Sequence, residues 1–83
     1  MDESKAIEYL MHFGMSRQEA TVYLRLIEAG KQTGYEIARD TGISRSNVYA
    51  SLAALVEKGA AYLVEEDAKR YICLLYTSDA ADD

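Results

Sequence analysis

The sequence of 83 residues contains no proline, no tryptophan, five glycines, one cysteine and one histidine. A single cysteine, Cys73, excludes an intramolecular disulfide and an all-cysteine zinc site. The histidine, His12, has no cysteine or second histidine at ligand spacing, so we do not expect it to bind a metal. The sequence therefore predicts no metal and no other cofactor. The absence of proline and the small number of glycines predict short connections between helices and strands.

Long apolar runs and an excess of basic residues are also missing. No apolar stretch approaches the roughly 20 residues of a membrane span, and the acidic start is unlike a signal peptide. We therefore expect a soluble cytoplasmic protein with no membrane partner. The 9 Lys and Arg minus 14 Asp and Glu give a net charge of −5, which argues against coating nucleic acid by bulk basicity. One locally basic face remains compatible with this sum.

The composition is that of one small globular domain, with 49% hydrophobic and 28% charged residues. Apolar residues at helical spacing predict a first helix over residues 3–12. Ser16 followed by Glu19 is a capping box, which predicts a second helix that ends near residue 28. The side chains expected to face inward from this helix are Ala20, Tyr23, Leu24 and Ile27.

A second capping box, Thr33 with Glu36, predicts a short third helix that ends at residue 39 or 40. Gly42 can adopt the positive φ that a tight corner between helices requires. Ser44 is expected to cap a fourth helix over residues 44–58. The residues expected to form its core stripe are Val48, Leu52, Leu55 and Val56.

After this helix the hydrophobic pattern changes. Residues 61–65 and 69–73 are short aromatic or β-branched runs on either side of a three-residue turn, which predicts a β-hairpin. The predicted fold class is therefore mainly α with a small β-hairpin, in the order of a winged helix-turn-helix.

The predicted fourth helix is suited to a DNA groove. Its length of about 22 Å exceeds the roughly 12 Å width of the B-DNA major groove. The side opposite its core stripe carries short side chains: Ser46, Asn47, Ala50, Ala53 and Ala54. An alanine methyl can contact a thymine methyl, and an asparagine can pair with an adenine edge. The hypothesis is that residues 44–58 form the recognition helix.

Phosphate contacts are expected from three places: the first turn of the fourth helix, the start of the third helix, and the hairpin wing over residues 61–73, whose charges would lie on the backbone or in the minor groove. The complete set of candidate DNA-binding residues is Thr33, Tyr35, Ser44, Arg45, Ser46, Asn47, Tyr49, Ala50, Lys69 and Arg70.

Other interpretations of these residues remain open. An alanine-rich exposed face is also typical of a strong helix former, and Tyr49 is equally compatible with core packing. The acidic balance favours an alternative function, a winged-helix protein-interaction module of a transcription complex without specific DNA readout. An enzyme is disfavoured, because there is no phosphate-binding glycine loop and no nucleophile beside a base.

Several segments together resemble one known family, the TrmB-type transcriptional regulators. The matching segments are residues 13–24 (FGMSRQEATVYL), 36–38 (EIA), 41–49 (TGISRSNVY), Leu52, Leu55, 57–59 (EKG) and 69–71 (KRY). The resemblance covers residues 4–72 and implies the winged helix-turn-helix DNA-binding domain of an archaeal or bacterial regulator. It also implies a homodimer on double-stranded DNA. An effector ligand is implied only if a C-terminal sensor domain, absent from this sequence, exists.

Two positions depart from the family pattern. Members often have proline at the position of Ser44 and a second basic residue at that of Asn47. The asparagine reduces attraction to phosphate, so a sequence preference cannot be carried over from the family.

The end of the chain resembles translated sequencing-adapter DNA. We expect residues 1–72 to form the domain, and residues 73–83 to be an unstructured, non-native tail on a truncated chain; a frayed natural tail is the alternative. Three acidic residues, Asp79, Asp82 and Asp83, belong to this tail. Without them the charge sum is 9 minus 11, or −2.

Overall fold

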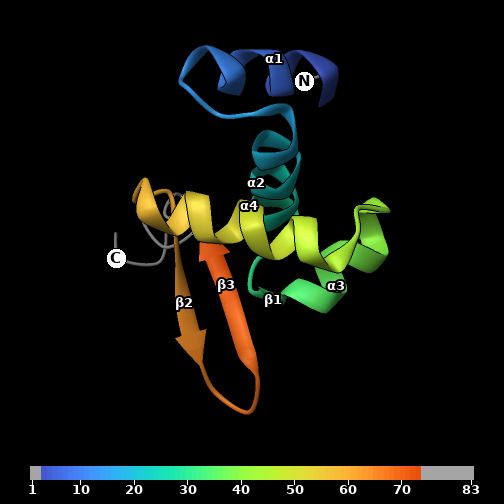
Figure 1. The fold of residues 1–83 in the computed structure, drawn as a ribbon, viewed down its shortest axis with the longest axis vertical. Helices are drawn as coiled ribbons and strands as arrows, with labels where there is room; N and C mark the ends of the chain where they lie inside the picture. Colours follow the sequence, from blue (N-terminus) through green and yellow to red (C-terminus); the bar gives the residue numbers. More distant parts are fainter. Residues whose placement is uncertain (1–2, 74–83) are drawn as a thin grey trace.

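The computed structural model describes residues 3–73 as four helices and three short strands (Figure 1). They are α1 (Glu3–His12), α2 (Arg17–Ala29), β1 (Gln32–Thr33), α3 (Gly34–Thr41), α4 (Arg45–Glu57), β2 (Ala61–Glu65) and β3 (Lys69–Cys73). The strands form one antiparallel sheet in the order β1-β3-β2. Figure 1 shows α1 at one end of the molecule and the β2–β3 hairpin at the other, with α4 crossing between them. The predicted fold class is confirmed.

Local signals place the helix starts as expected. In each capping box the two hydrogen bonds measure 3.0 and 3.1 Å, between Ser16 and Glu19 before α2 and between Thr33 and Glu36 before α3. Ser44 is the N-cap residue of α4 and Lys58 its C-cap residue, so the regular helix is one residue shorter at each end than predicted. Gly42 has φ +81°, which provides the corner between α3 and α4.

Strand β1 was not predicted. It contains two residues, which are too few to show an alternating pattern, and it exists because Gln32 pairs with Tyr71 and Thr33 with Arg70 on β3. This pairing attaches the start of α3 to the hairpin. The third strand is therefore a consequence of tertiary contact.

The core lies between α2, α3, α4 and the base of the hairpin. Val48, Leu52 and Leu55 of α4 are fully buried, as predicted, but the prediction for Val56 is wrong because this residue is 38% exposed. With 3.6 residues per turn, Val56 lies about 90° around the helix from the centre of the buried stripe. Ser51, which lies within that stripe, is buried in its place.

Helix α2 is buried on more than one side. Val22 and Leu26 are fully buried, whereas Leu24 and Ile27, which were predicted to face inward, are half-buried. Helix α2 contacts α1, α3, α4 and β3. A single inward stripe is therefore the wrong expectation for this central helix.

Cys73, which was assigned both to the predicted hairpin and to the expected tail, lies in the hairpin. It is the last residue of β3, pairs with Ala61 and is fully buried, so the folded unit includes this residue of the expected tail. Its burial follows from the alternation of side chains along the hairpin, which directs Cys73 and Ala61 to the core face. Residues 74–83 lie outside the described residues. Among residues 3–73, no helix is both long enough and apolar enough to cross a membrane.

An ion pair connects the end of α4 to the start of α2. Lys58 Nζ lies 2.6 Å from Glu19 Oε1 and donates a second hydrogen bond, 3.0 Å long, to the carbonyl of Gly14. The hydrogen bond from Lys58 holds the pKa of Glu19 below its usual value, against an opposing effect of burial. A lowered pKa in the folded state means that the ionised carboxylate stabilises the fold.

We expect Glu19→Gln to cost about 0.5 to 1 kcal/mol at neutral pH, because the amide retains the capping box and loses the charge. The stabilisation by Glu19 is complete above the unfolded pKa, near 4.5, and disappears as pH falls through the lower folded value. Urea unfolding at pH 7 and near pH 3 tests this: the two proteins should differ only at pH 7. Glu8→Gln, at an exposed position on α1, is the matched control. An equal difference at both pH values would contradict the prediction.

Candidate nucleic-acid interface

Helix α4 carries the predicted recognition surface. It packs on α2 and α3 through its buried stripe, and its opposite side is open. The exposed residues on that side, together with the N-cap residue, are Ser44, Arg45, Ser46, Asn47, Ala50 and Ala53. The structure thus places five of the ten candidate residues (Ser44 to Asn47, and Ala50) on one accessible surface. Ala53, which was predicted on the same side of the helix, is exposed there too, whereas Ala54 is half-buried.

The N-terminus of α4 differs from those of α2 and α3. In the other two helices a glutamate at the third position accepts a hydrogen bond from the cap residue's own amide. In α4 this position is Asn47, whose amide N lies 3.4 Å from Ser44 Oγ, and the first turn contains no acidic residue. The partial positive charge of the α4 N-terminus is therefore not compensated by a carboxylate, and this end is suited to a phosphate.

The start of α3 is less open. The Thr33 amide donates to Glu36 Oε1, and the Thr33 hydroxyl accepts from the Glu36 amide, so both groups are already engaged. Gly34 is buried beneath the ring of Tyr49, with which a Cβ at position 34 would overlap. The Glu36 carboxylate supplies negative charge where Thr33 was expected to hold a phosphate. From the sequence, the role of this carboxylate at the site was predicted only as a helix cap.

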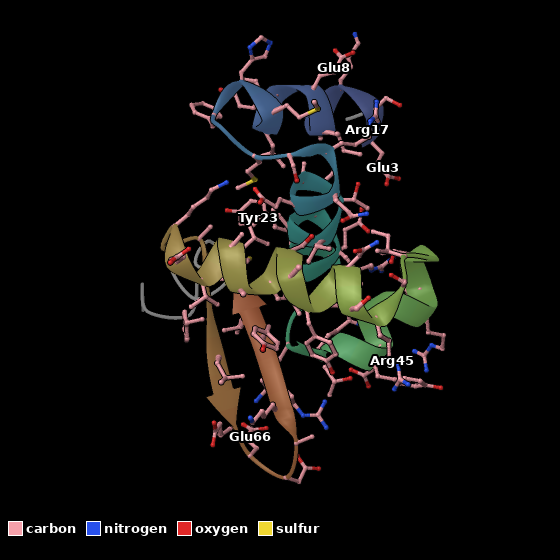
Figure 2. The ribbon with its side chains drawn as sticks, in the orientation of Figure 1. Glu3, Glu8, Arg17, Tyr23, Arg45 and Glu66 are labelled. Atoms are coloured by element: carbon pink, nitrogen blue, oxygen red, sulfur yellow. The ribbon has the colours of Figure 1, made fainter. Side chains whose placement is uncertain are left out.

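Two tyrosines flank Gly34. Tyr49 packs on Gly34 and still leaves 46% of its surface exposed. Its position is therefore compatible both with packing and with a contact to DNA. Tyr35 is 55% exposed, and its ring lies 5.7 Å from the guanidinium carbon of Arg45. Figure 2 shows Arg45 where the start of α4 meets α3. The structure therefore brings Tyr35, Arg45 and Tyr49 together around the α3–α4 junction.

The hairpin separates the two basic residues predicted on it. Lys69 and Arg70 are neighbours on β3, so their side chains point to opposite faces of the sheet. Lys69 is exposed and forms no ion pair with any residue between 3 and 73. Arg70 lies 3.6 to 3.9 Å from three carboxylates, those of Glu36, Glu66 and Asp67.

The end of the hairpin is acidic. Glu66, labelled in Figure 2, lies near the tip together with Glu65 and Asp67, and it also pairs with Lys31 at 2.7 Å. Acidic groups at this position repel a phosphate backbone and compete with it for Arg70. Closer to α4 the hairpin packs inward: burial raises the pKa of Tyr71, and the neighbouring Tyr49 adds to this effect.

Comparison with known proteins is decisive for the family. Residues 10–77 match the family described as the sugar-specific transcriptional regulator TrmB. The chain belongs to the TrmB family. The TrmB match extends beyond the domain boundary expected at residue 72. The TrmB fold and family are those of DNA-binding transcriptional regulators and not of enzymes.

Two curated relatives are similar to this TrmB-family chain. One is the HTH-type sugar sensing transcriptional regulator TrmBL1 of Pyrococcus furiosus, 27% identical over 86% of this chain and 21% of its own length. The other is the uncharacterized protein YrhO of Bacillus subtilis, 27% identical over 80% of this chain and 24% of its own length. The chain thus spans less than a quarter of the length of either relative.

Two solved structures share the fold. TrmBL2, an archaeal chromatin protein described with a novel mode of DNA binding, has a TM-score of 0.80 and 26% identity over 88% of this chain and 29% of its own. The Zalpha domain of Carassius auratus PKZ, solved with Z-DNA, has a TM-score of 0.66 and 21% identity over 70% of this chain and 94% of its own. The second likeness concerns the winged-helix fold alone.

Proposed function

We propose that this TrmB-family domain binds double-stranded DNA sequence-specifically as part of a transcriptional regulator, with α4 in the major groove. The observation that carries the proposal is the open N-terminus of α4, where Asn47 replaces a capping glutamate beside an exposed arginine, Arg45. The family and the TrmBL2 likeness support DNA as the partner. Neither of them identifies an operator.

Base readout is assigned to the exposed side of α4. Asn47 offers a donor and an acceptor that match an adenine edge, and the methyl group of Ala50 matches a thymine methyl. Ser46 is exposed in the first turn and can donate to either a base or a phosphate. Because these side chains are short, the helix backbone can approach the floor of the groove closely.

Phosphate contacts are assigned to residues whose charge or amides are free. Ser44 and Arg45 provide them at the start of α4, and Tyr49 offers its hydroxyl beside them. Lys69 provides the contact from the wing, on the face opposite Arg70. Thr33 and Arg70 contribute only if DNA displaces their present carboxylate partners, which makes them the weakest members of the proposed set.

We also propose that the regulator acts as a homodimer. One domain makes few phosphate contacts, and useful affinity requires two half-sites about 34 Å apart, or a multiple of that distance. An effector ligand enters the proposal only for a longer chain that carries a further domain, as the greater length of the relatives allows.

Replacing Arg45 by alanine tests the DNA interface. We expect affinity for a mixed-sequence duplex of roughly 30 base pairs to fall about tenfold, and the slope of log K against log salt to become less negative by about one. Fluorescence anisotropy across a salt series measures both. Lys5→Ala, which removes an exposed charge on α1, is the matched control and should change neither quantity. A flat salt response in the wild type, unchanged by Arg45→Ala, would favour the protein-interaction module instead.

A further inference from the structure

We propose that Tyr35 is a positioning residue, whose ring holds the Arg45 guanidinium in the orientation used to bind DNA. This inference rests on the proposed function and assigns a separate role within it. The expectation from the sequence was a phosphate contact by Tyr35 itself. The geometry points to an action through Arg45.

The two residues come from different helices and meet at the α3–α4 junction. Tyr35 is the second residue of α3 and Arg45 the first of α4, and the guanidinium carbon lies 5.7 Å from the ring centroid. This distance is within the range of a cation–π interaction. Arg45 forms no ion pair with any residue in the described part of the chain, so the ring is its main partner.

The chemical group beside an arginine determines whether the guanidinium remains available to bind DNA. Arg70 lies 3.6 to 3.9 Å from three carboxylates, whose negative charges offset its positive charge and compete with a phosphate for it. An aromatic ring instead covers one face of a guanidinium and leaves the donors in its plane free for a phosphate or a guanine edge. Arg45 is therefore restrained and still able to bind.

A second contact between the same helices supports the placement of Tyr35 beside Arg45. Gly34, immediately before Tyr35, lies buried beneath the ring of Tyr49, and Tyr49 is one turn after Arg45 on α4. This close contact fixes how near the first turn of α3 lies to α4. Contact with the Tyr35 ring reduces the number of rotamers that Arg45 must lose when DNA binds.

The experiment compares Tyr35→Phe with Tyr35→Leu, each in the full chain and in the Arg45→Met background, on the mixed-sequence duplex. We expect Tyr35→Phe to bind as tightly as the wild type and Tyr35→Leu to bind about two- to fivefold more weakly. In the Arg45→Met background neither change should matter. The salt slope should stay unchanged in Tyr35→Leu, because no charge is lost, and should become less negative by about one in Arg45→Met. Tyr9→Leu, at an exposed tyrosine of α1, is the control.

A measurement without DNA separates the two proposals. In free protein, the Arg45 Hδ resonances should be shifted by the ring in the wild type and Tyr35→Phe, and should return to ordinary values in Tyr35→Leu.

Equal losses of affinity in Tyr35→Phe and Tyr35→Leu would show a contact through the hydroxyl and overturn the inference. So would an effect of Tyr35→Leu that persists in Arg45→Met. If Arg45→Met weakens binding and Tyr35→Leu does not, the inference fails and the proposed function stands; if the wild type binds no duplex, both fail.

Discussion

Asn47→Glu is expected to make the folded domain more stable and to weaken DNA binding strongly. The change completes at α4 the capping box that α2 and α3 already have, with the new carboxylate accepting from the Ser44 amide. It also places a negative charge at the positive end of the helix. The free energy of unfolding should rise by about 0.5 to 1 kcal/mol.

The same carboxylate lies where the proposal places a phosphate and an adenine edge. Loss of the base contact is worth about 1 to 3 kcal/mol, and repulsion adds to it, so duplex affinity should fall roughly 100-fold. Urea unfolding and anisotropy on one sample measure both effects. The opposite signs distinguish this result from ordinary misfolding, which lowers stability and affinity together.

Asn47→Gln is the matched control. Glutamine can close the capping box without a charge, so it should recover part of the added stability while affecting DNA binding far less than glutamate does. Unchanged duplex affinity in Asn47→Glu would remove the start of α4 from the interface. The protein-interaction alternative would then be favoured.

Leu55→Ala is expected to cost about 2 to 5 kcal/mol of unfolding free energy, whereas Val56→Ala should cost less than about 1. The two residues are neighbours on α4, but Leu55 is fully buried and Val56 is 38% exposed. Truncating Leu55 leaves a cavity between α4 and the core. Truncating Val56 mainly removes surface that already contacts water.

The size of the domain makes the Leu55 effect large. A small domain has a total stability of about 5 to 15 kcal/mol, so Leu55→Ala should lower the urea midpoint substantially or unfold the protein at room temperature. Chemical denaturation followed by far-UV circular dichroism measures the difference between the two variants. Equal losses of unfolding free energy in Leu55→Ala and Val56→Ala would contradict this expectation and support the core stripe predicted from the sequence, in which both residues faced inward.

The helix starts, the corner at Gly42 and the two hairpin strands were all predictable from short segments. Capping boxes, a glycine with positive φ and a change in apolar period each depend on residues close together in the chain. The burial of α4 was also nearly correct, because one helix face packs against one core. The prediction was wrong at Val56, on the margin of that face, and it missed the burial of Ser51 and the half-burial of Ala54.

The candidate site was only partly predictable. Exposure of Arg45, Ser46, Asn47 and Ala50 followed from the helical period. The pairing of Tyr35 with Arg45 and that of Arg70 with Glu36 did not, because Tyr35 meets Arg45 across a helix junction, and Arg70 meets Glu36 through the pairing of β3 with β1. No local rule relates residues that far apart.

The helices, their caps, the two hairpin strands and the exposed face of α4 were thus determined by interactions between residues close together in the sequence. The backbone imposes the geometry of such interactions in any context. Which cations stay available for DNA was set by folding. Lys69 and Arg70 are equivalent in the sequence, but the sheet directs one to solvent and the other to three carboxylates. A charge has its effect through its distance to other charges in space, and those distances exist only once the strands and helices have packed.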